Sequence, residues 1–312
     1  MSRRAAQMAM AELGWMQRAR QRALRTAVRQ RRGHIVDQLI AERGIGLVAN
    51  PLWPLYRPLL YKILHYSEAV EMADTLGPLP GTAGMRYISE LLSLNLEISG
   101  ISRIPREGGF IIAANHPTGI ADGVAVYDAV RQVRGDISIF TNRDAVRVNE
   151  RLVEHLIPVE WREEHRSLTK TRETLRLSSK AFAEERAIVV FPAGRIAYWQ
   201  GGRLNERPWQ VSAVSLAQKH KVPVLPCRVT ARNSWLFYLF GNQGLTELRD
   251  MTVFHELLNK RGKTFKINFG PLIPHTALQG SAARLTEQLQ TYCVESLAKD
   301  PDLPFTAKED NT

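Results

Sequence analysis

The sequence has very few cysteines and no long apolar run. Only Cys227 and Cys293 occur among 312 residues, too few for a disulfide framework, which favours a reducing, cytoplasmic location. No stretch of 18 apolar residues is present, so we expect no membrane-spanning helix. The amino-terminal region also lacks the apolar stretch of a secretory signal. These absences predict a cytoplasmic protein that can lie on a membrane without crossing it.

Several enzyme signatures are absent as well. There is no Gly-x-Ser-x-Gly elbow of the serine hydrolases, no phosphate-binding loop with Gly-Lys, and no Gly-x-Gly-x-x-Gly dinucleotide fingerprint. His255-Glu256 begins like a zinc-protease helix, but the second histidine is missing. Cysteines and histidines are not clustered as in a structural zinc site. We therefore expect no metal and no cofactor.

Acidic residues are scarce relative to basic ones, and the net charge of +11 suggests an anionic partner. Residues 1–32 contain nine arginines and a single acid, Glu12. One face of a basic amphipathic helix would hold arginines spaced by three or four: Arg18, Arg22, Arg25, Arg29 and Arg32. From this segment alone, a membrane-surface anchor, a nucleic-acid arm and a solvated or disordered tail remain open.

The next segment, residues 47–66, is apolar and aromatic but is interrupted by prolines, which are Pro51, Pro54 and Pro58. Three prolines are unfavourable in a helix of a protein core. Trp53 and Tyr56 beside basic residues suit the headgroup level of a bilayer. This favours an anionic membrane surface over nucleic acid as the partner, and we expect no nucleic acid. A buried packing segment is the equally weighted alternative.

From about residue 96, apolar runs alternate with helical patterns. The runs predict strands at 96–101, 110–115, 137–142, 187–192, 222–230 and 264–270, and the patterns predict helices at 124–134, 145–155, 167–185, 209–220 and 281–297. Such alternation predicts an α/β fold with a mainly parallel, helix-covered sheet. We divide the chain into a basic helical arm (1–45), a helical, Pro- and aromatic-rich membrane-proximal segment (46–95), an α/β domain (96–300) and a polar tail (301–312).

The strand predicted at 110–115 leads directly into the sequence Asn-His-Pro-Thr-Gly-Ile-Ala-Asp-Gly. His116 then lies at the carboxyl end of a strand and Asp122 near the start of a helix, where α/β sheets place their chemistry. A carboxylate that accepts one ring N–H fixes the tautomer and leaves the other nitrogen as a base. The alternative is a loop histidine and a helix-capping aspartate that never meet.

Three further stretches lie at predicted strand ends. Phe191-Pro192-Ala193-Gly194-Arg195 combines a tight turn with an arginine, and the strand at 137–142 is followed by Arg143. Residues 222–226 read Val-Pro-Val-Leu-Pro. A guanidinium at such a position offers paired, charge-assisted donors to a phosphate or carboxylate. Each arginine taken alone is also compatible with an ordinary surface charge.

Taken in order, these stretches resemble the 1-acylglycerol-3-phosphate acyltransferase (PlsC-like glycerolipid acyltransferase) family over about residues 97–270. The family has Asn-His followed by Asp, a strand ending near a basic residue, Phe-Pro-Glu-Gly-Thr-Arg, and Val-Pro-x-x-Pro. Here five residues, not four, separate His116 from Asp122, and Ala193 replaces the glutamate. Both departures resemble the branch of hemolysin-like and ornithine-lipid-type acyltransferases.

The resemblance implies that residues 96–300 form an acyltransferase domain in which His116 is the general base and Asp122 orients it. It implies transfer of a fatty acyl group from acyl-CoA or acyl-carrier protein to the hydroxyl of a lysophospholipid or related lysolipid, at the cytoplasmic face of the cell membrane. The implied substrate-binding residues are Asn115, Gly119, Arg143, Arg147, Pro192, Gly194 and Arg195. The alternative is a non-catalytic protein that binds membranes or nucleic acid through its arginine-rich arm.

Overall fold

The computed structural model describes residues 33–160, 162 and 166–307. The arginine-rich arm lies outside the described residues, and with it the predicted membrane residues Arg18, Arg22, Arg25 and Arg29.

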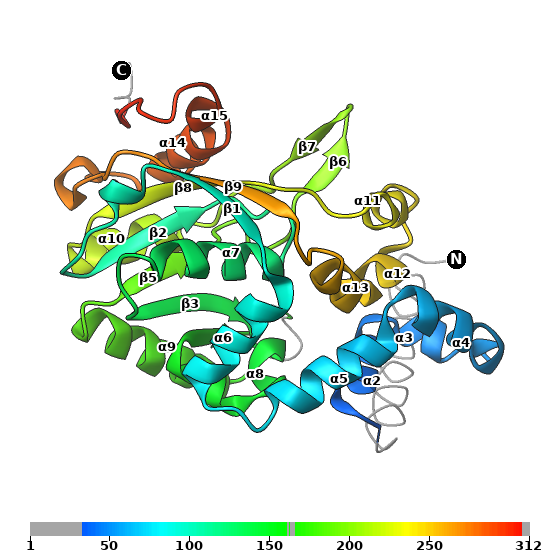
Figure 1. Cartoon of the computed structure of the whole chain (residues 1–312). Coiled ribbons are helices and arrows are strands. Elements are labelled where there is room, and N and C mark those ends of the chain that lie inside the picture. Colours follow the sequence, from blue (N-terminus) through cyan, green and yellow to red (C-terminus); the bar gives the residue numbers. More distant parts are fainter. Residues whose placement is uncertain (1–32, 161, 163–165, 308–312) are drawn as a thin grey trace, which may run out of the picture.

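A seven-stranded sheet forms the centre of the molecule (Figure 1), in the order β1-β9-β8-β2-β5-β3-β4. Its strands are β1 (Asn95–Ser99), β2 (Phe110–Ala114), β3 (Ile137–Asn142), β4 (Leu156–Val159), β5 (Ala187–Val190), β8 (Val224–Thr230) and β9 (Thr264–Phe269). Neighbouring strands are parallel except for the antiparallel pair β8–β9. The predicted α/β fold with a mainly parallel sheet is confirmed.

Strand β2 lies in the middle of the sheet and is buried on both faces. Phe110 and Ile112 join one hydrophobic core, whereas Ile111 and Ala113 join the other. The continuous apolar run arises from this position, because a strand covered on both faces has no polar side. The first core lies under α6 (Gly81–Leu92) and α7 (Ile120–Val130), and the second under α9 (Leu168–Ala183), α10 (Ser212–His220) and α14 (Ala282–Thr291).

A layer of helices covers the carboxyl ends of β2, β3, β4, β5 and β8, the five strands that run in the same direction, on the right in Figure 1. We call it the helical cap; it consists of α2 (Ile35–Arg43), α3 (Ile45–Val48), α4 (Trp53–Ile63), α5 (Tyr66–Leu76), α11 (Trp235–Asn242), α12 (Thr246–Met251) and α13 (Val253–Leu258). The cap joins distant parts of the chain. The Glu247 carboxylate accepts the main-chain N–H groups of Gly46 and Leu47 at 3.1 and 3.0 Å.

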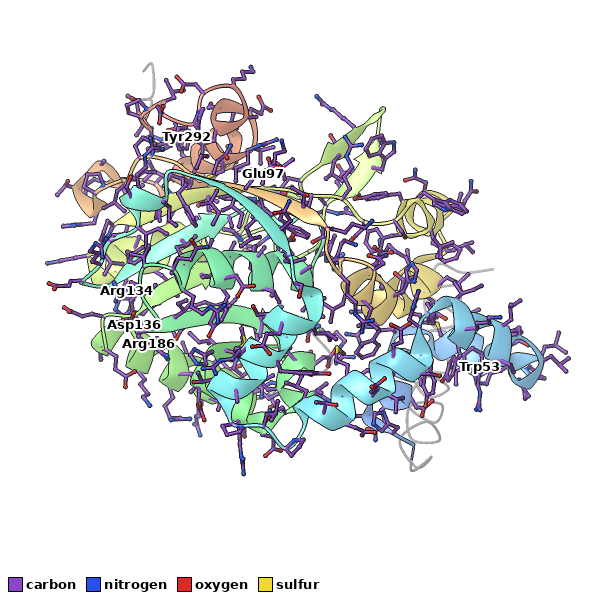
Figure 2. All side chains as sticks on the ribbon, in the orientation of Figure 1. Trp53, Glu97, Arg134, Asp136, Arg186 and Tyr292 are labelled. Atoms are coloured by element: carbon purple, nitrogen blue, oxygen red, sulfur yellow. The ribbon has the colours of Figure 1, made fainter. Side chains whose placement is uncertain are left out.

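At the opposite, amino-terminal edge of the sheet, an ion pair joins Arg134 and Asp136. Figure 2 shows Arg134, Asp136 and Arg186 gathered there. The Arg134 guanidinium donates to Asp136 at 2.7 Å and to the carbonyl of Gly108 at 2.8 Å, which ties the loops before β2 and β3 together.

One predicted helix is wrong. Residues 145–155 do not form a single helix but α8 (Asp144–Val148) and the 3₁₀ turn η2 (Glu150–Glu154), which are separated at Asn149. The Asn149 side-chain amide donates to the carbonyls of Leu76 and Leu79 at 2.8 and 2.9 Å and accepts the N–H of Arg151 at 2.9 Å. These bonds give the backbone an alternative to the helical ladder and end the helix there.

Other elements complete the chain. Helix α4 continues through its interior proline, Pro58. A hairpin of β6 (Tyr198–Gln200) and β7 (Arg203–Asn205) follows the third family motif, residues 191–195, where the sequence predicted no strand. The remaining short elements are η1 (Ile101–Arg103), η4 (His275–Ala277), the π-helical turn η5 (Tyr292–Ser296) and α15 (Leu297–Lys299). Among the residues that the structure describes, no helix is long and apolar enough to span a membrane.

Candidate active site

The turn from β2 to α7 brings His116 and Asp122 together at the carboxyl edge. His116 Nδ1 lies 3.0 Å from Asp122 Oδ2, and the aspartate side chain is fully buried whereas 18% of the histidine side chain is exposed. The two atoms are at ion-pair distance without the alignment of a hydrogen bond. The alternative in which the two residues never meet is therefore excluded.

Asp122 is fixed by groups other than the histidine. It accepts hydrogen bonds from Thr118 N at 2.8 Å, Thr118 Oγ1 at 2.5 Å and Gly119 N at 2.9 Å. It also lies in the first turn of α7, where the exposed N–H groups of a helix favour negative charge. These contacts fix the Asp122 carboxylate independently of the conformation of His116. Thr118 was not among the predicted site residues.

Gly119 makes this turn sterically feasible. It has a φ of 101°, a conformation that residues with a side chain rarely adopt, and a Cβ here would lie 2.8 Å from Ile196 Cδ1. Its predicted contact with substrate is not tested by the structure. What the geometry shows is that Gly119 lets the chain turn sharply enough for its own N–H and that of Thr118 to reach Asp122.

Asn115 continues the sheet beyond the end of β2. Its amide donates to Val229 O at 2.9 Å and accepts from Val229 N at 2.7 Å, so it pairs with the main chain of β8 as a further residue of the ladder would. This fixes the position of the following His116. Substrate binding by Asn115 stays a prediction.

The third motif packs directly against the histidine. The Phe191 ring lies 4.4 Å from the His116 ring at an interplanar angle of 30°. Pro192 is buried and its carbonyl accepts from Gln210 N at 2.9 Å, while Gly194 (φ 61°) closes a turn by donating to Phe191 O at 3.0 Å. Phe191 thus covers one face of the imidazole, a role that the sequence had not suggested.

The three predicted acceptor-binding arginines have different surroundings. Arg143 Nη1 lies 2.6 Å from Glu173, and Arg147 donates to both oxygens of Glu42 at 2.7 and 2.9 Å. Arg195 follows the Gly194 turn, is exposed, and makes no ion pair or hydrogen bond with any residue the structure describes. Of the three, Arg195 is the one whose guanidinium is not already engaged by a carboxylate.

Glu206 is a site residue that sequence reasoning missed. It follows β7, and both of its carboxylate oxygens lie 3.2 Å from the main-chain N of His116. Burial raises the pKa of the Glu206 carboxyl to about 7; the nearby Asp122 adds to this, while Arg228 opposes it. Its local sequence carries no signal for this position, because only the β6–β7 hairpin brings it to the histidine.

A second buried polar cluster lies at α13 in the helical cap. Glu256, on α13, accepts from Ser234 Oγ at 2.5 Å and from Lys260 Nζ at 3.0 Å, and both charged side chains are about 4% exposed. The carboxylate of the His255-Glu256 sequence is thus already engaged by a hydroxyl and an ammonium group. Within the described part of the chain, no three His, Cys, Asp or Glu side chains are grouped to hold a metal ion.

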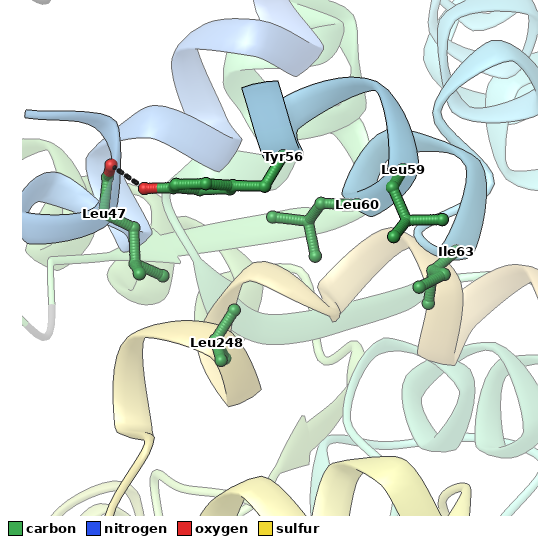
Figure 3. Close-up of a pocket in the computed structure, with 6 residues that line it drawn as sticks. All are labelled: Leu47, Tyr56, Leu59, Leu60, Ile63 and Leu248. Carbon is green, nitrogen blue, oxygen red and sulfur yellow. Dashed lines mark hydrogen bonds between the residues drawn. The ribbon is translucent and has the colours of Figure 1, made fainter. Parts of the chain in front are cut away.

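An open apolar pocket of about 350 Å³ lies in the helical cap between α4 and α12 (Figure 3). It is lined by Leu47, Tyr56, Leu59, Leu60, Ile63 and Leu248. The Tyr56 hydroxyl donates to Leu47 O at 2.6 Å, which removes the one polar tip from the lining. Such a lining suits an alkyl chain better than a polar molecule.

Comparison with known proteins identifies the family to which the chain belongs. A family model described as Acyltransferase matches residues 57–297, which is most of the chain and includes all four motifs. The chain therefore belongs to the acyltransferase family and is an enzyme of that class. The family resemblance drawn from the motifs is confirmed. Membership of this enzyme family disfavours the alternative of a non-catalytic binding protein.

Two curated relatives and one solved structure share between 15% and 28% sequence identity with the chain. The chain is 28% identical over 222 residues to the lyso-glycine lipid O-acyltransferase of Phocaeicola vulgatus, which covers 69% of this chain and 77% of the relative. It is 25% identical over 221 residues to the protein of the same name from Bacteroides thetaiotaomicron, covering 69% and 79%. The crystal structure of the 1-acyl-sn-glycerophosphate (LPA) acyltransferase PlsC from Thermotoga maritima aligns with a TM-score of 0.44 and 15% identity, over 83% of this chain and 97% of that one.

Proposed function

We propose that this acyltransferase moves a fatty acyl group from the thioester of acyl-CoA or acyl-carrier protein to the hydroxyl of a lysolipid, with His116 as general base. The observation that carries the proposal is the 3.0 Å contact between His116 Nδ1 and a buried Asp122 at the carboxyl edge of the sheet. Family membership supports acyl transfer. The lysolipid names of both curated relatives support the acceptor class.

The proposed steps follow from which ring nitrogen is free. Because Nδ1 faces Asp122, Nε2 is the nitrogen that takes the proton from the acceptor hydroxyl while the hydroxyl oxygen attacks the thioester carbonyl. Asp122 stabilises the imidazolium that forms. The tetrahedral intermediate then expels the thiolate, which recovers the proton from His116, so the products are an ester lipid and a free thiol. General-base assistance of this kind contributes about 10²- to 10⁴-fold, and the chemistry requires no cofactor.

Arg195 is the side chain we assign to an anionic group of the acceptor. It follows the turn that begins at Phe191, and the Phe191 ring touches His116, so the main chain of Arg195 is joined to the base by this short turn. Its exposure and lack of a carboxylate partner among the described residues leave its donors available. Arg143 and Arg147 are less suitable because Glu173 and Glu42 already neutralise them.

We further propose peripheral binding at the cytoplasmic face of the cell membrane. Helix α4 and its N-cap residue expose a stripe of apolar side chains at a spacing of three or four residues, namely Leu52, Leu55, Leu59 and Ile63. Trp53, one of the predicted membrane residues, is instead buried against Tyr56 and Tyr61. The apolar surface offered to a bilayer is thus made of aliphatic side chains, beside a chain that carries a strong positive charge.

The test is thiol release from palmitoyl-CoA with a panel of lysophospholipids, lyso-ornithine lipid and lyso-glycine lipid. We expect acceptor-dependent release that His116→Ala lowers by about 10²- to 10⁴-fold while the unfolding midpoint is unchanged. Release without acceptor would indicate thioester hydrolysis and contradict the proposal. A blank with palmitoyl-CoA is followed by palmitoyl-acyl-carrier protein, and a blank with both donors would reject the proposed function.

A further inference from the structure

Two carboxylates from separate segments of the chain lie next to His116. Asp122 faces the imidazole from the same turn, whereas Glu206 reaches the histidine main chain from beyond the β6–β7 hairpin, 90 residues later in the sequence. Both oxygens of Glu206 lie 3.2 Å from His116 N, so the carboxylate straddles a single N–H group. The main-chain carbonyl of His116 accepts a hydrogen bond from Ala197 N at 2.9 Å. The residue before the hairpin and a residue after it thus hold both main-chain polar groups of the histidine.

The third motif makes this second carboxylate informative. Where the family pattern has a glutamate, this chain has Ala193, which is buried among apolar side chains and cannot accept a hydrogen bond through its side chain. Glu206 is a second carboxyl group, besides Asp122, that the chain brings to the histidine. This second acid comes from the segment after the β6–β7 hairpin and not from the third motif.

We propose that Glu206 is a positioning residue for His116: its carboxylate fixes the main chain of the turn that carries the base, and its negative charge stabilises the imidazolium formed during acyl transfer. The proposal rests on the proposed function, in which His116 is the base. A carboxylate that accepts a main-chain N–H makes a charge-assisted bond, which is about twice as strong as a neutral one. A fixed negative charge near an imidazole favours its protonated form.

The surroundings of Glu206 determine when its charge is present. The titratable groups that face it are His116 and Asp122 from the β2–α7 turn, Arg228 from β8 and Cys293 from η5. Burial raises the pKa of Glu206 to about 7, so the carboxylate is lost as the pH falls through neutrality. His116 must be neutral to act as a base. Both requirements therefore reduce activity on the same, acid side of the pH profile.

The test is the pH dependence of kcat for acyl transfer from palmitoyl-CoA to the best acceptor of the panel. For the wild type we expect an acid limb whose slope exceeds one over the pH range in which Glu206 gains its proton, because the loss of its charge adds to the loss of the neutral base. Glu206→Gln keeps the shape and one acceptor oxygen but removes the charge. We expect it to lower kcat at pH 8 by about tenfold, to leave the KM for palmitoyl-CoA within about twofold, and to move the acid limb to lower pH with a slope of one.

The matched control is Glu107→Gln. Glu107 is exposed before the amino end of β2, so its loss changes the net charge equally but far from the carboxyl edge. We expect its profile to match the wild type. If Glu206→Gln gives a wild-type profile that is only scaled down, Glu206 has a structural role alone and the proposal is overturned.

A second variant keeps the test decisive if Glu206→Gln does not fold. Arg228 lowers the pKa of Glu206, so Arg228→Met should move the acid limb to higher pH, and it should have no such effect when combined with Glu206→Gln. An unmoved limb in Arg228→Met would overturn the proposal. Failure of the proposed function is separate: it would appear as a wild type without acceptor-dependent thiol release, before any profile is measured.

Discussion

The aspartate of the site is held by Thr118 and Gly119, independently of the histidine beside it. We therefore expect Asp122→Asn to keep the turn but to lose the charge that stabilises the imidazolium. The expected result is a fall in kcat of about 10²- to 10⁴-fold with little change in KM, measured by thiol release. Thr118→Val removes only the 2.5 Å hydroxyl bond to Asp122 and should cost about tenfold or less. Equal losses in the two variants would contradict a role for the charge.

Glu206 also makes the stability of the protein depend on pH. Its pKa in the folded state is about 7 instead of the ordinary 4.5, because burial disfavours the charged form. The folded state therefore binds this proton more readily than the unfolded state, and the free energy of unfolding falls as the pH rises from about 4.5 to 7. It stays reduced above that range.

We accordingly expect Glu206→Gln to be more stable, relative to the wild type, at pH 8 than at pH 5. Urea unfolding at both pH values measures the difference, with Glu107→Gln as the exposed control. If the difference between Glu206→Gln and the wild type is the same at pH 5 and pH 8, the raised pKa of Glu206 is refuted.

Among the elements, α4 makes the sharpest prediction. Leu52 and Leu55 are 58% and 77% exposed and belong to its apolar stripe. Replacing both with aspartate should weaken binding to anionic vesicles by about tenfold or more, because burial of a leucine in an apolar phase contributes about 1.5–3 kcal/mol. Flotation of phosphatidylglycerol vesicles measures this.

The control for α4 is the same pair of substitutions on another helix. Leu168 and Leu175 of α9 are 76% and 59% exposed, so Leu168→Asp with Leu175→Asp introduces equal charge and removes equal exposed apolar surface. Vesicle binding should be unaffected by this control. If the two double variants weaken flotation equally, α4 is not the membrane-contacting face.

The elements also show what could be predicted from the sequence. Strands such as β2 were predictable because burial on both faces requires a continuous apolar run. The break at Asn149 was not, since it depends on bonds to Leu76 and Leu79, which are distant in sequence. His116 and Asp122 could be found because one turn carries both. Glu206 could not, because a hairpin without a motif delivers it.

At the scale of the whole molecule, charge should govern attachment to membranes. Replacing Arg18, Arg22, Arg25 and Arg29 by glutamine lowers the net charge from +11 to +7. Each basic residue near an anionic surface contributes about 1 kcal/mol, so we expect vesicle flotation to fall strongly at low salt. For the unmodified chain it should fall as NaCl is raised from 50 to 500 mM. Displacement from vesicles by a DNA duplex, with a steep salt dependence for DNA, would favour a nucleic-acid role for these arginines.

The contact between Glu247 and the main chain of Gly46 and Leu47 closes the helical cap across about 200 residues of sequence. During synthesis, α2 to α5 leave the ribosome long before α12 and α13 exist to cover them. Their apolar faces, including Leu39, Ile40 and Met72, then have no native partner from the second half of the chain. Contacts of such long range slow folding and leave apolar surface open to chaperones or to other nascent chains. The helical cap is thus completed late, after most strands of the sheet have been synthesised.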